Sequence, residues 1–310
     1  MNIAILGATS QIAKDLIRSF ANITDYKCSL FSRNSDSLVE WLQYNNITKD
    51  YEILDYSSFS GDEKFDVIIN FIGVGNPAKA LSMGASIFHT TLEYDLLVLS
   101  YLVKNPTCKY IFLSSGAVYG SNFNEPVDIN SEAHIPINNL KQQDWYGVAK
   151  LYAESRHRAL PDLSIVDIRL FNYYSYSQNI SARFLISDVL RAIQSNTVLI
   201  TSPNNIVRDY IGPHDFYCLI SQLISFPTLN DVVDSYTKEP VDKFTLFLAL
   251  KEKFGFEYEV DDSPAGLNAT GMKMNYFSVN RKASEYGYLP TKTSLDSVLE
   301  QSELLLDNIN

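Results

Sequence analysis

A tyrosine and a lysine lie four residues apart in the segment DWYGVAKLYAE, residues 144–154. The segment has helical spacing, and residues four apart share one face of a helix, so the Lys150 ammonium can approach the Tyr146 phenol. A nearby cation favours the phenolate and lowers the phenol pKa from about 10 toward the working pH. The pair could therefore exchange a proton with a carbonyl or hydroxyl oxygen while hydride moves at the attached carbon.

The spacing alone is not specific, because Tyr288 and Lys292 repeat it in YLPTK, where an intervening proline argues against an ordinary helix. The context of the first pair is more informative. The apolar segment IFLSS ends in Ser114 and Ser115, at the carboxyl end of a predicted buried strand. Ligands of α/β sheets bind at that end. Ser115 therefore joins the tyrosine and the lysine as a candidate catalytic group.

The elements that must position these groups alternate along the first half of the chain. Apolar runs predict strands at 2–6, 27–31, 66–73, 109–115 and 163–171, and helical spacing predicts helices at 11–20, 36–44, 86–104 and 144–159. Continuous apolar strands separated by helices are typical of a parallel sheet covered on both faces. The sequence thus predicts an α/β fold, a Rossmann-type doubly wound parallel sheet.

The regular alternation of strands and helices ends after residue 171. A polar and aromatic segment there leads into predicted helices near 181–194, 241–253 and 294–306, with short strands between them. We predict a smaller mixed α/β C-terminal substrate lobe. The dinucleotide-binding domain would span 1–171, with 208–235 returning to it, and the lobe would comprise 172–207 and 236–310. A ligand cleft would then lie between the two parts.

The segment GATSQIA places Gly7, Ser10 and Ala13 where a dinucleotide-binding turn usually has glycines. Gly7 permits the tight turn, and the two small residues could take over the other positions, with the Ser10 hydroxyl facing phosphate. A plain strand-to-helix turn would have the same composition. The location, after the first strand and at the start of the first helix, favours the nucleotide interpretation.

The second strand ends in FSRN, without the acidic residue that accepts hydrogen bonds from an adenosine ribose. Ser32 and Arg33 suit a 2′-phosphate instead, so NADP(H) is favoured and NAD(H) remains possible. The alternative is a solvated surface arginine. Asp55 and Tyr56, after the third strand, fit an adenine pocket, although an aspartate in a loop often only caps a turn.

Several segments resemble the extended short-chain dehydrogenase/reductase family, which includes nucleotide-sugar epimerases, dehydratases and ketoreductases. They are GATSQIA, NFIGVG, SSGAVYG, YGVAK, RLFN, RDYIGPHD and NRKASEYGYLP, and they run through most of the chain. The resemblance implies that Ser115 hydrogen-bonds the reacting oxygen, that Tyr146 is the acid or base, and that Lys150 tunes Tyr146 and holds the nicotinamide ribose. It implies cofactor contacts from Gly7, Thr9, Ser10, Gln11, Ile12, Ser32, Arg33, Asn34, Asp55, Tyr56, Phe71, Ile72, Gly73, Tyr146, Lys150, Leu170 and Phe171.

On the substrate side, the resemblance implies contacts from Ser115, Gly116, Asn172, Arg183 and Arg208. Arg208 also has a physical argument, since a guanidinium can grip a diphosphate in bidentate fashion. The alternative is a salt bridge from Arg208 to Asp209 or Asp215.

Positions at which this sequence departs from the family pattern reduce the number of candidate reactions. The acid pair that the 4,6-dehydratases carry after the strand serine is replaced by Gly116 and Ala117. Cys108 precedes its strand, on the wrong side of the sheet for the 3,5-epimerising members. We therefore expect NADPH-dependent reduction of a nucleotide-linked 4-keto-6-deoxysugar in surface-polysaccharide biosynthesis. The alternatives are a nucleotide-sugar C4 epimerase with tightly held NAD and a non-catalytic dinucleotide-binding sensor.

Composition limits the partners. The formal charge is −11 with Lys and Arg spread along the chain, which argues against nucleic acid as a partner. No apolar run approaches the roughly 18 residues that span a bilayer, so we expect no membrane contact and a cytoplasmic location. The three cysteines are expected to be reduced thiols and the four histidines share no metal-ligand spacing, so no metal is expected. The family resemblance implies a homodimer through the helices near 86–104 and 144–159.

Overall fold

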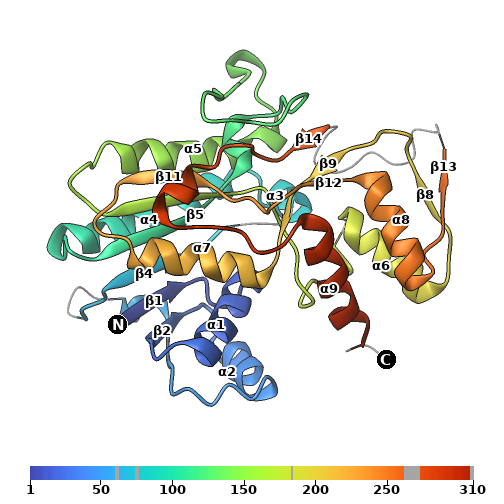
Figure 1. The fold of residues 1–310 in the computed structure, drawn as a ribbon. Coiled ribbons are helices and arrows are strands. Elements are labelled where there is room, and N and C mark those ends of the chain that lie inside the picture. The colour runs from blue at the N-terminus through green and yellow to red at the C-terminus, as the bar shows by residue number, and fades with distance from the viewer. Residues whose placement is uncertain (60–62, 74–76, 183, 262–272, 308–310) are drawn as a thin grey trace.

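The computed structural model describes residues 1–59, 63–73, 77–182, 184–261 and 273–307. Its centre is a parallel sheet in the order β11-β6-β5-β4-β1-β2-β3 (Figure 1). The order reverses between β1 and β4, the arrangement of a doubly wound Rossmann-type sheet. Its strands are β1 (Asn2–Leu6), β2 (Lys27–Phe31), β3 (Glu52–Leu54), β4 (Val67–Asn70), β5 (Lys109–Ser115), β6 (Ile165–Leu170) and β11 (Asp231–Asp234).

Helices cover both faces of this sheet because its strands are apolar on both sides. In β1, Ile3 and Ile5 pack into the core below α1, α2 and α7, whereas Ala4 and Leu6 pack into the core below α4 and α5. These helices are α1 (Gln11–Ile23), α2 (Ser35–Tyr44), α7 (Pro213–Ser225), α4 (Ser86–Lys104) and α5 (Trp145–Arg158), and a short α3 (Pro77–Met83) precedes α4. The predicted fold class is confirmed.

The C-terminal part adds a lobe with its own apolar core (Figure 1). Its helices are α6 (Leu185–Ser195), α8 (Lys243–Phe254) and α9 (Ser294–Asp307). Its short strands are β7 (Asn172–Tyr173) with β10 (Tyr210–Ile211), β9 (Val207–Arg208) with β12 (Val241–Asp242) and β14 (Asn275–Tyr276), and β8 (Leu199–Thr201) with β13 (Tyr258–Val260). Single 3₁₀ turns occur at Tyr56–Ser58, Gly116–Tyr119, Ile137–Asn139, Gln142–Asp144 and Lys282–Tyr286.

The chain crosses between these two parts more than once. After β10, α7 packs against α1, and β11 then pairs with β6 at the edge of the main sheet. The predicted boundaries at 171, 208 and 235 are compatible with this path and stay predictions. The strand expected over 66–73 ends at Asn70, because the Asn70 side chain accepts a hydrogen bond from Ile72 N at 2.8 Å and turns the backbone there.

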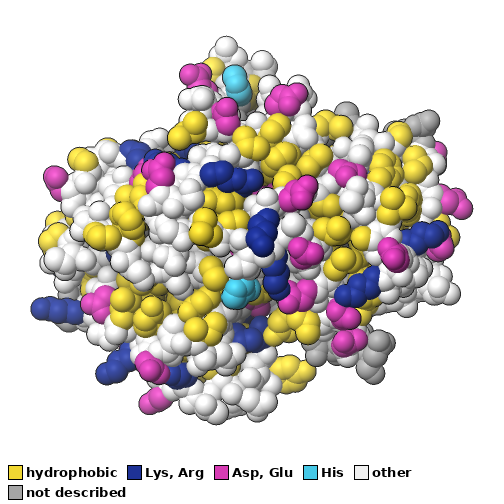
Figure 2. Space-filling view, in the orientation of Figure 1, with side chains coloured by type: hydrophobic (Ala, Val, Ile, Leu, Met, Phe, Trp, Pro, Cys, Tyr) yellow, Lys and Arg dark blue, Asp and Glu magenta, His cyan; other side chains and the backbone are white. Residues whose placement is uncertain are grey.

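Charges are mixed on the face drawn in Figure 2, where basic side chains lie singly or in small groups beside acidic ones. Such a surface lacks the continuous basic stripe of a nucleic-acid binder. Within the described part of the chain, no helix is long and apolar enough to cross a membrane.

Candidate active site

The point where the strand order reverses is also where the candidate residues gather. The carboxyl ends of β1, β4, β5 and β6 bring four segments to one edge of the sheet: the Gly7 turn, Phe71–Gly73, Ser115 and Leu170–Phe171. In open α/β sheets the crevice at this position binds the ligand. The site is therefore built from residues that are far apart in the sequence.

The first of these segments is the turn between β1 and α1. Gly7 has a φ of +76°, and a Cβ there would lie 3.1 Å from Ile72 N, so a glycine is required. Ser10 is the N-cap of α1 and accepts a hydrogen bond from Ala13 N at 3.3 Å. The N-terminus of α1 thus points out of the turn, as in sites that hold a pyrophosphate. Thr9 beside it is exposed.

Two further residues of this turn face the protein. Ile12 packs partly buried against the core. Gln11 donates hydrogen bonds to Ser175 Oγ at 2.9 Å and Gln178 Oε1 at 3.2 Å. The Gln11 amide therefore links α1 to the segment that follows β7, a contact that the sequence did not reveal.

The end of β2 presents an unsatisfied polar group. Ser32 is 1% exposed, and its Oγ has no hydrogen-bond partner among the described residues. Arg33 beside it is exposed. Asn34 is the N-cap of α2, accepting from Ser37 N at 3.1 Å. A buried hydroxyl normally has a hydrogen-bond partner, so the Ser32 hydroxyl is an unsatisfied polar group beside the exposed Arg33 side chain.

The residues after β3 have more local roles. Asp55 is exposed and caps the 3₁₀ turn, accepting from Ser57 N at 2.7 Å. The Tyr56 hydroxyl accepts from Gly7 N at 2.9 Å and donates to Phe31 O at 3.2 Å. Tyr56 therefore fixes the nucleotide turn itself, in addition to any contact with a bound ligand.

The candidate catalytic tyrosine lies in the first turn of α5, next to the end of β5. Gly147 allows this closeness, since a Cβ there would lie only 2.4 Å from Ala117 O. Tyr146 lies beside Ser115, whose Oγ accepts a hydrogen bond from Ala117 N at 3.2 Å. Burial, and next to it the Tyr276 phenol, raise the pKa of Tyr146 above its usual range, while Ser115 lowers it by less.

Lys150 does not point at that phenol. Its Nζ donates to Leu113 O at 2.7 Å and lies 4.1 Å from the centre of the Phe112 ring. A Cβ at Gly73 would be 3.2 Å from the same nitrogen. Burial lowers the pKa of Lys150 to about 8. The expected lowering of the Tyr146 pKa by Lys150 is thus wrong for this structure, because burial dominates and the ammonium is engaged elsewhere.

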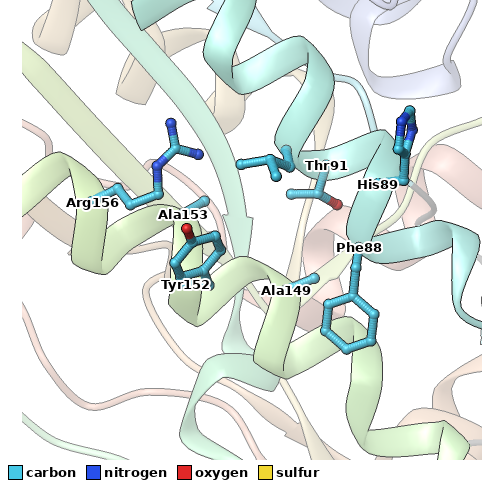
Figure 3. Close-up of a pocket in the computed structure, with 8 residues that line it drawn as sticks. Phe88, His89, Thr91, Ala149, Tyr152, Ala153 and Arg156 are labelled. Carbon is cyan, nitrogen blue, oxygen red and sulfur yellow. The ribbon is translucent and has the colours of Figure 1, made fainter.

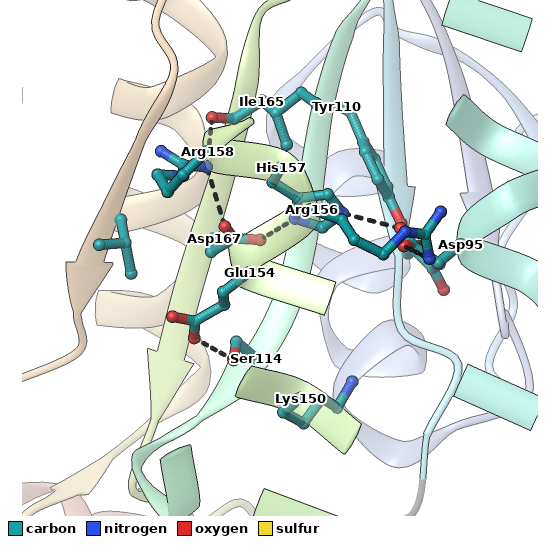
Figure 4. A network of polar contacts seen from close by, with 12 residues as sticks. Asp95, Tyr110, Ser114, Lys150, Glu154, Arg156, His157, Arg158, Ile165 and Asp167 are labelled. Carbon is teal, nitrogen blue, oxygen red and sulfur yellow. Dashed lines mark hydrogen bonds and ion pairs between the residues drawn. The ribbon is translucent and has the colours of Figure 1, made fainter. Parts of the chain in front are cut away.

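A buried polar network lies next to Lys150 between α4, α5 and the sheet (Figure 4). His157 is fully buried, with its ring nitrogens 2.8 Å from Asp95 Oδ1 and 2.6 Å from Asp167 Oδ1. Burial opposes a charge on His157, but Asp167 and Asp95 outweigh it and raise its pKa to about 9. Arg156 pairs with Asp95 at 3.0 Å and Arg158 with Asp167 at 2.8 Å, so His157 is a structural ion-pair residue.

A second branch of the network reaches the catalytic strand. Ser114, the neighbour of Ser115, donates to Glu154 Oε1 at 2.5 Å. Glu154 also pairs with Arg169 of β6 at 2.6 Å. This branch ties α5, β5 and β6 together one turn beyond Lys150, and so fixes the helix face that carries the site.

The lobe contributes a tyrosine that the sequence did not single out. Tyr276 of β14 lies beside Ser115, and its ring centre lies 5.2 Å from that of Phe171 and 4.7 Å from that of Phe123. Phe171 also covers the buried Gly116, and Leu170 is partly buried beside the core. Two phenols, Tyr146 and Tyr276, therefore meet at one serine, one from each part of the chain.

Two cations flank Tyr276. The Arg208 guanidinium lies 6.0 Å and Lys273 Nζ 4.3 Å from its ring centre. Arg208 donates to Val207 O at 2.7 Å, and no ion pair joins either cation to a carboxylate of the described residues. Burial lowers the pKa of both, that of Lys273 to about 8. Arg208 is buried and Lys273 is half-buried, and the attraction of Asp144 only partly opposes the lowering of the Lys273 pKa. Two adjacent cations of this kind can bind an anion.

The alternative salt bridge of Arg208 is not found. Asp209 accepts from Thr237 N at 3.0 Å and from Ser294 Oγ at 2.7 Å, and Asp215 accepts from Thr291 N at 2.9 Å. Asn172 donates to the main-chain oxygens of Asp209 and Tyr276, each at 3.3 Å, and so supports this wall of the site. Arg183 lies outside the described residues. The sequence motifs did not point to Lys273 and Tyr276. Both residues lie outside every quoted motif, a few residues before the segment NRKASEYGYLP.

The sheet, the turn at Gly7 and the Ser115–Tyr146 contact define a dinucleotide-dependent enzyme of the short-chain dehydrogenase type. The chain belongs to the NAD dependent epimerase/dehydratase family, whose model matches residues 3–232. The prediction of an NAD(P)-dependent sugar-nucleotide oxidoreductase or epimerase is thereby confirmed at the level of the family. No curated protein matches the chain.

Solved structures of nucleotide-sugar epimerases share the fold over the whole chain. UDP-glucose 4-epimerase from Thermotoga maritima, with UDP-glucose, is 18% identical with a TM-score of 0.79, covering 100% of both chains. UDP-glucose-4-epimerase from Stenotrophomonas maltophila, with NAD and formylated UDP-arabinopyranose, is 15% identical with a TM-score of 0.82, covering 100% of this chain and 99% of that one. UDP-glucuronic acid 4-epimerase from Bacillus cereus, with UDP-glucuronic acid and NAD, is 16% identical with a TM-score of 0.78, covering 99% and 100%.

Proposed function

We propose that this protein is an NADPH-dependent reductase of a nucleotide-linked 4-keto-6-deoxysugar that feeds surface-polysaccharide synthesis. The observation that carries the choice of reaction is the end of β2, where the buried Ser32 hydroxyl has no partner among the described residues and Arg33 is exposed. This pair suits a 2′-phosphate, and an NADPH-using enzyme of this family is most economically a reductase.

The predicted substrate-binding residues favour a substrate that carries a diphosphate group. Arg208 and Lys273 are close enough for the Arg208 charge to lower the pKa of Lys273, and an anion between them would relieve that repulsion. A guanidinium and an ammonium together grip a diphosphate. The solved relatives bind uridine diphosphate sugars, which makes UDP the first nucleotide to test.

The residues of this chain have distinct tasks in such a reaction. Bound NADPH would supply the hydride to the sugar carbonyl carbon. Tyr146 gives its proton to the carbonyl oxygen, and its raised pKa keeps it in the protonated form that a reductase needs. Ser115 donates to the same oxygen as charge grows there. Lys150, held beside Gly73 by Leu113 O, is located to bind the nicotinamide ribose.

A second candidate is a nucleotide-sugar C4 epimerase that retains NAD. It is favoured by the similarity of the whole fold to 4-epimerases, several of them solved with NAD. The same Ser115 and Tyr146 would serve both directions of hydride transfer. The departure at Phe31–Arg33 argues against it, since no carboxylate lies there for the ribose of NAD.

The exposed face of α4 and α5 supports a homodimer. Figure 3 gives a close view of a groove between the two helices, lined by Phe88, His89, Thr91, Leu92, Ala149, Tyr152, Ala153 and Arg156. Phe88 is 36%, Leu96 45% and Tyr152 55% exposed on this face. Contiguous exposed apolar side chains mark interaction surfaces, and a second copy would bury them. A Tyr152→Glu variant should then sediment as a monomer.

The test of the reaction begins with the cofactor. Purified protein is denatured, any released dinucleotide is identified, and the stripped protein is titrated with NADPH and NADH by fluorescence. We expect empty protein with at least tenfold tighter binding of NADPH, and consumption of NADPH with UDP-4-keto-6-deoxyglucose. Tightly held NAD together with interconversion of UDP-glucose and UDP-galactose would reject the reductase and support the epimerase.

A further inference from the structure

We propose that the start of α7 holds a divalent transition-metal ion of the zinc class, bound by His214, Cys218 and Asp215. The side-chain ligand atoms of these three residues all lie within 4.8 Å of one another. None of them belongs to the candidate active site. The proposal does not depend on which reaction the protein catalyses.

The geometry of the first two ligands matches a tetrahedral zinc ion. His214 and Cys218 are four residues apart on α7, so they share one face of the helix. Cys218 Sγ lies 3.7 Å from His214 Nε2. Zinc–nitrogen and zinc–sulfur bonds of about 2.0 and 2.3 Å at a tetrahedral angle require a separation of roughly 3.5 Å between the two atoms. The two side chains can therefore bind one ion with little movement.

Asp215 adds an independent observation. It is 3% exposed, and no ion pair joins it to a Lys, Arg or His of the described residues, since Lys292 Nζ pairs with Glu300. A buried carboxylate is normally paired with a cation or coordinates a metal. A zinc ion with one thiolate and one carboxylate would be neutral overall, which suits a helix N-terminus where an uncompensated cation is unfavourable.

The supporting hydrogen bonds are also in place. Asp215 Oδ1 accepts from Thr291 N at 2.9 Å and Oγ1 at 2.6 Å, and Oδ2 accepts from Lys292 N at 3.1 Å. Oδ2 also accepts from Thr291 N at 3.1 Å, so each oxygen accepts two hydrogen bonds. Such outer hydrogen bonds hold the carboxylates that ligate metals, and one of them must lengthen for an Asp215 oxygen to bind the ion. A metal here would join α7 to the 291–292 segment that leads into α9.

No metal is predicted from the sequence, because the four histidines share no metal-ligand spacing with one another. The pair His214–Cys218 becomes visible once α7 is known to begin at Pro213. The donor atoms determine the class of metal. A soft thiolate sulfur together with an imidazole nitrogen favours zinc or cobalt over magnesium or calcium.

The experiment uses the full chain treated with a chelator, with Co²⁺ as the probe. We expect a thiolate-to-cobalt charge-transfer absorption that Zn²⁺ abolishes by competition. His214→Ala and Cys218→Ser should each weaken Zn²⁺ binding at least tenfold, whereas His134→Ala, at another exposed histidine, should not change it. His214 is exposed, so its replacement does not threaten folding. Absence of the absorption in the wild-type protein, or its persistence in both ligand variants, would overturn the proposal.

Discussion

Lys150 Nζ donates a hydrogen bond to the main-chain oxygen of Leu113 at 2.7 Å, so strand β5 and not the Tyr146 phenol holds the ammonium. Ser115, two residues further along the same strand, lies beside the phenol. One strand therefore keeps the two side chains of α5 apart. The ammonium lies near Gly73, and the phenol lies near Tyr276.

This separation predicts the effect of removing the Tyr146 hydroxyl. In Tyr146→Phe the ring still fills its place, but the proton donor is lost, so kcat should fall by roughly 10²–10⁴. Binding of the dinucleotide should stay within about twofold, because Lys150 does not rely on the phenol. Tyr44→Phe, at a tyrosine that is 87% exposed, is the control. Unchanged turnover in Tyr146→Phe, measured by stopped-flow absorbance of the dinucleotide, would contradict the role of Tyr146 as proton donor, whereas absence of turnover in the wild-type protein would favour the non-catalytic sensor.

Arg33 predicts cofactor choice. Arg33→Ala should weaken NADPH binding at least tenfold and leave NADH binding unchanged, because only NADPH carries the 2′-phosphate. Lys27→Ala, an exposed cation at the other end of β2, controls for the loss of one positive charge. Fluorescence titrations with both dinucleotides make the comparison. Equal losses for NADPH and NADH would mean that Arg33 is only a solvated surface residue.

His157 predicts how stability depends on pH. Its folded pKa of about 9 lies above its unfolded value near 6.5. The charged ring therefore stabilises the fold fully below pH 6.5, and this stabilisation is lost as the pH rises through about 9. The shift corresponds to about 3 kcal/mol. His157→Gln should cost about that much at pH 6, and the difference from wild type should shrink by pH 9 in urea unfolding.

The control for this prediction is His89→Gln, an exposed histidine whose replacement should cost little at any pH. Lys150 also contributes to the pH dependence of stability. Its lowered pKa makes the free energy of unfolding rise with pH between about 8 and 10.5. That contribution is common to wild type and His157→Gln and cancels in the difference. A gap between them that stays constant from pH 6 to 9 would contradict the assignment of a charged His157.

The sequence predicted the main sheet well because period and composition carry that information. The apolar runs ending in Leu6, Phe31 and Ser115 are the strands β1, β2 and β5, since burial on both faces demands continuous apolar residues. The motif around Gly7 was also readable, because only a residue without Cβ fits the close approach of Ile72.

The sequence could not predict the contacts between distant segments. Tyr276 is 161 residues from Ser115, and its strand β14 has only two residues, too short for any periodic signal. The direction of the Lys150 side chain was likewise unreadable, because helical spacing places Lys150 and Tyr146 on one face but does not choose between Leu113 O and the phenol as partner. Burial reverses the expected shift of the Tyr146 pKa, and it arises where Leu151 of α5 and Tyr276 of the lobe pack against the same apolar cluster.

Lys273 is the strongest test of the substrate side, because no motif pointed to it. Lys273→Met keeps the apolar stem over the rings of Phe123 and Tyr276 but removes the charge. The KM for the nucleotide sugar should rise at least tenfold while kcat and NADPH binding change little, since an ion-pair contact to the diphosphate acts in the ground state and transition state alike. Lys238→Met, at an exposed lysine, is the control. If the KM stays constant and UDP alone binds equally well to Lys273→Met and wild type, the anion site at Arg208 and Lys273 is refuted.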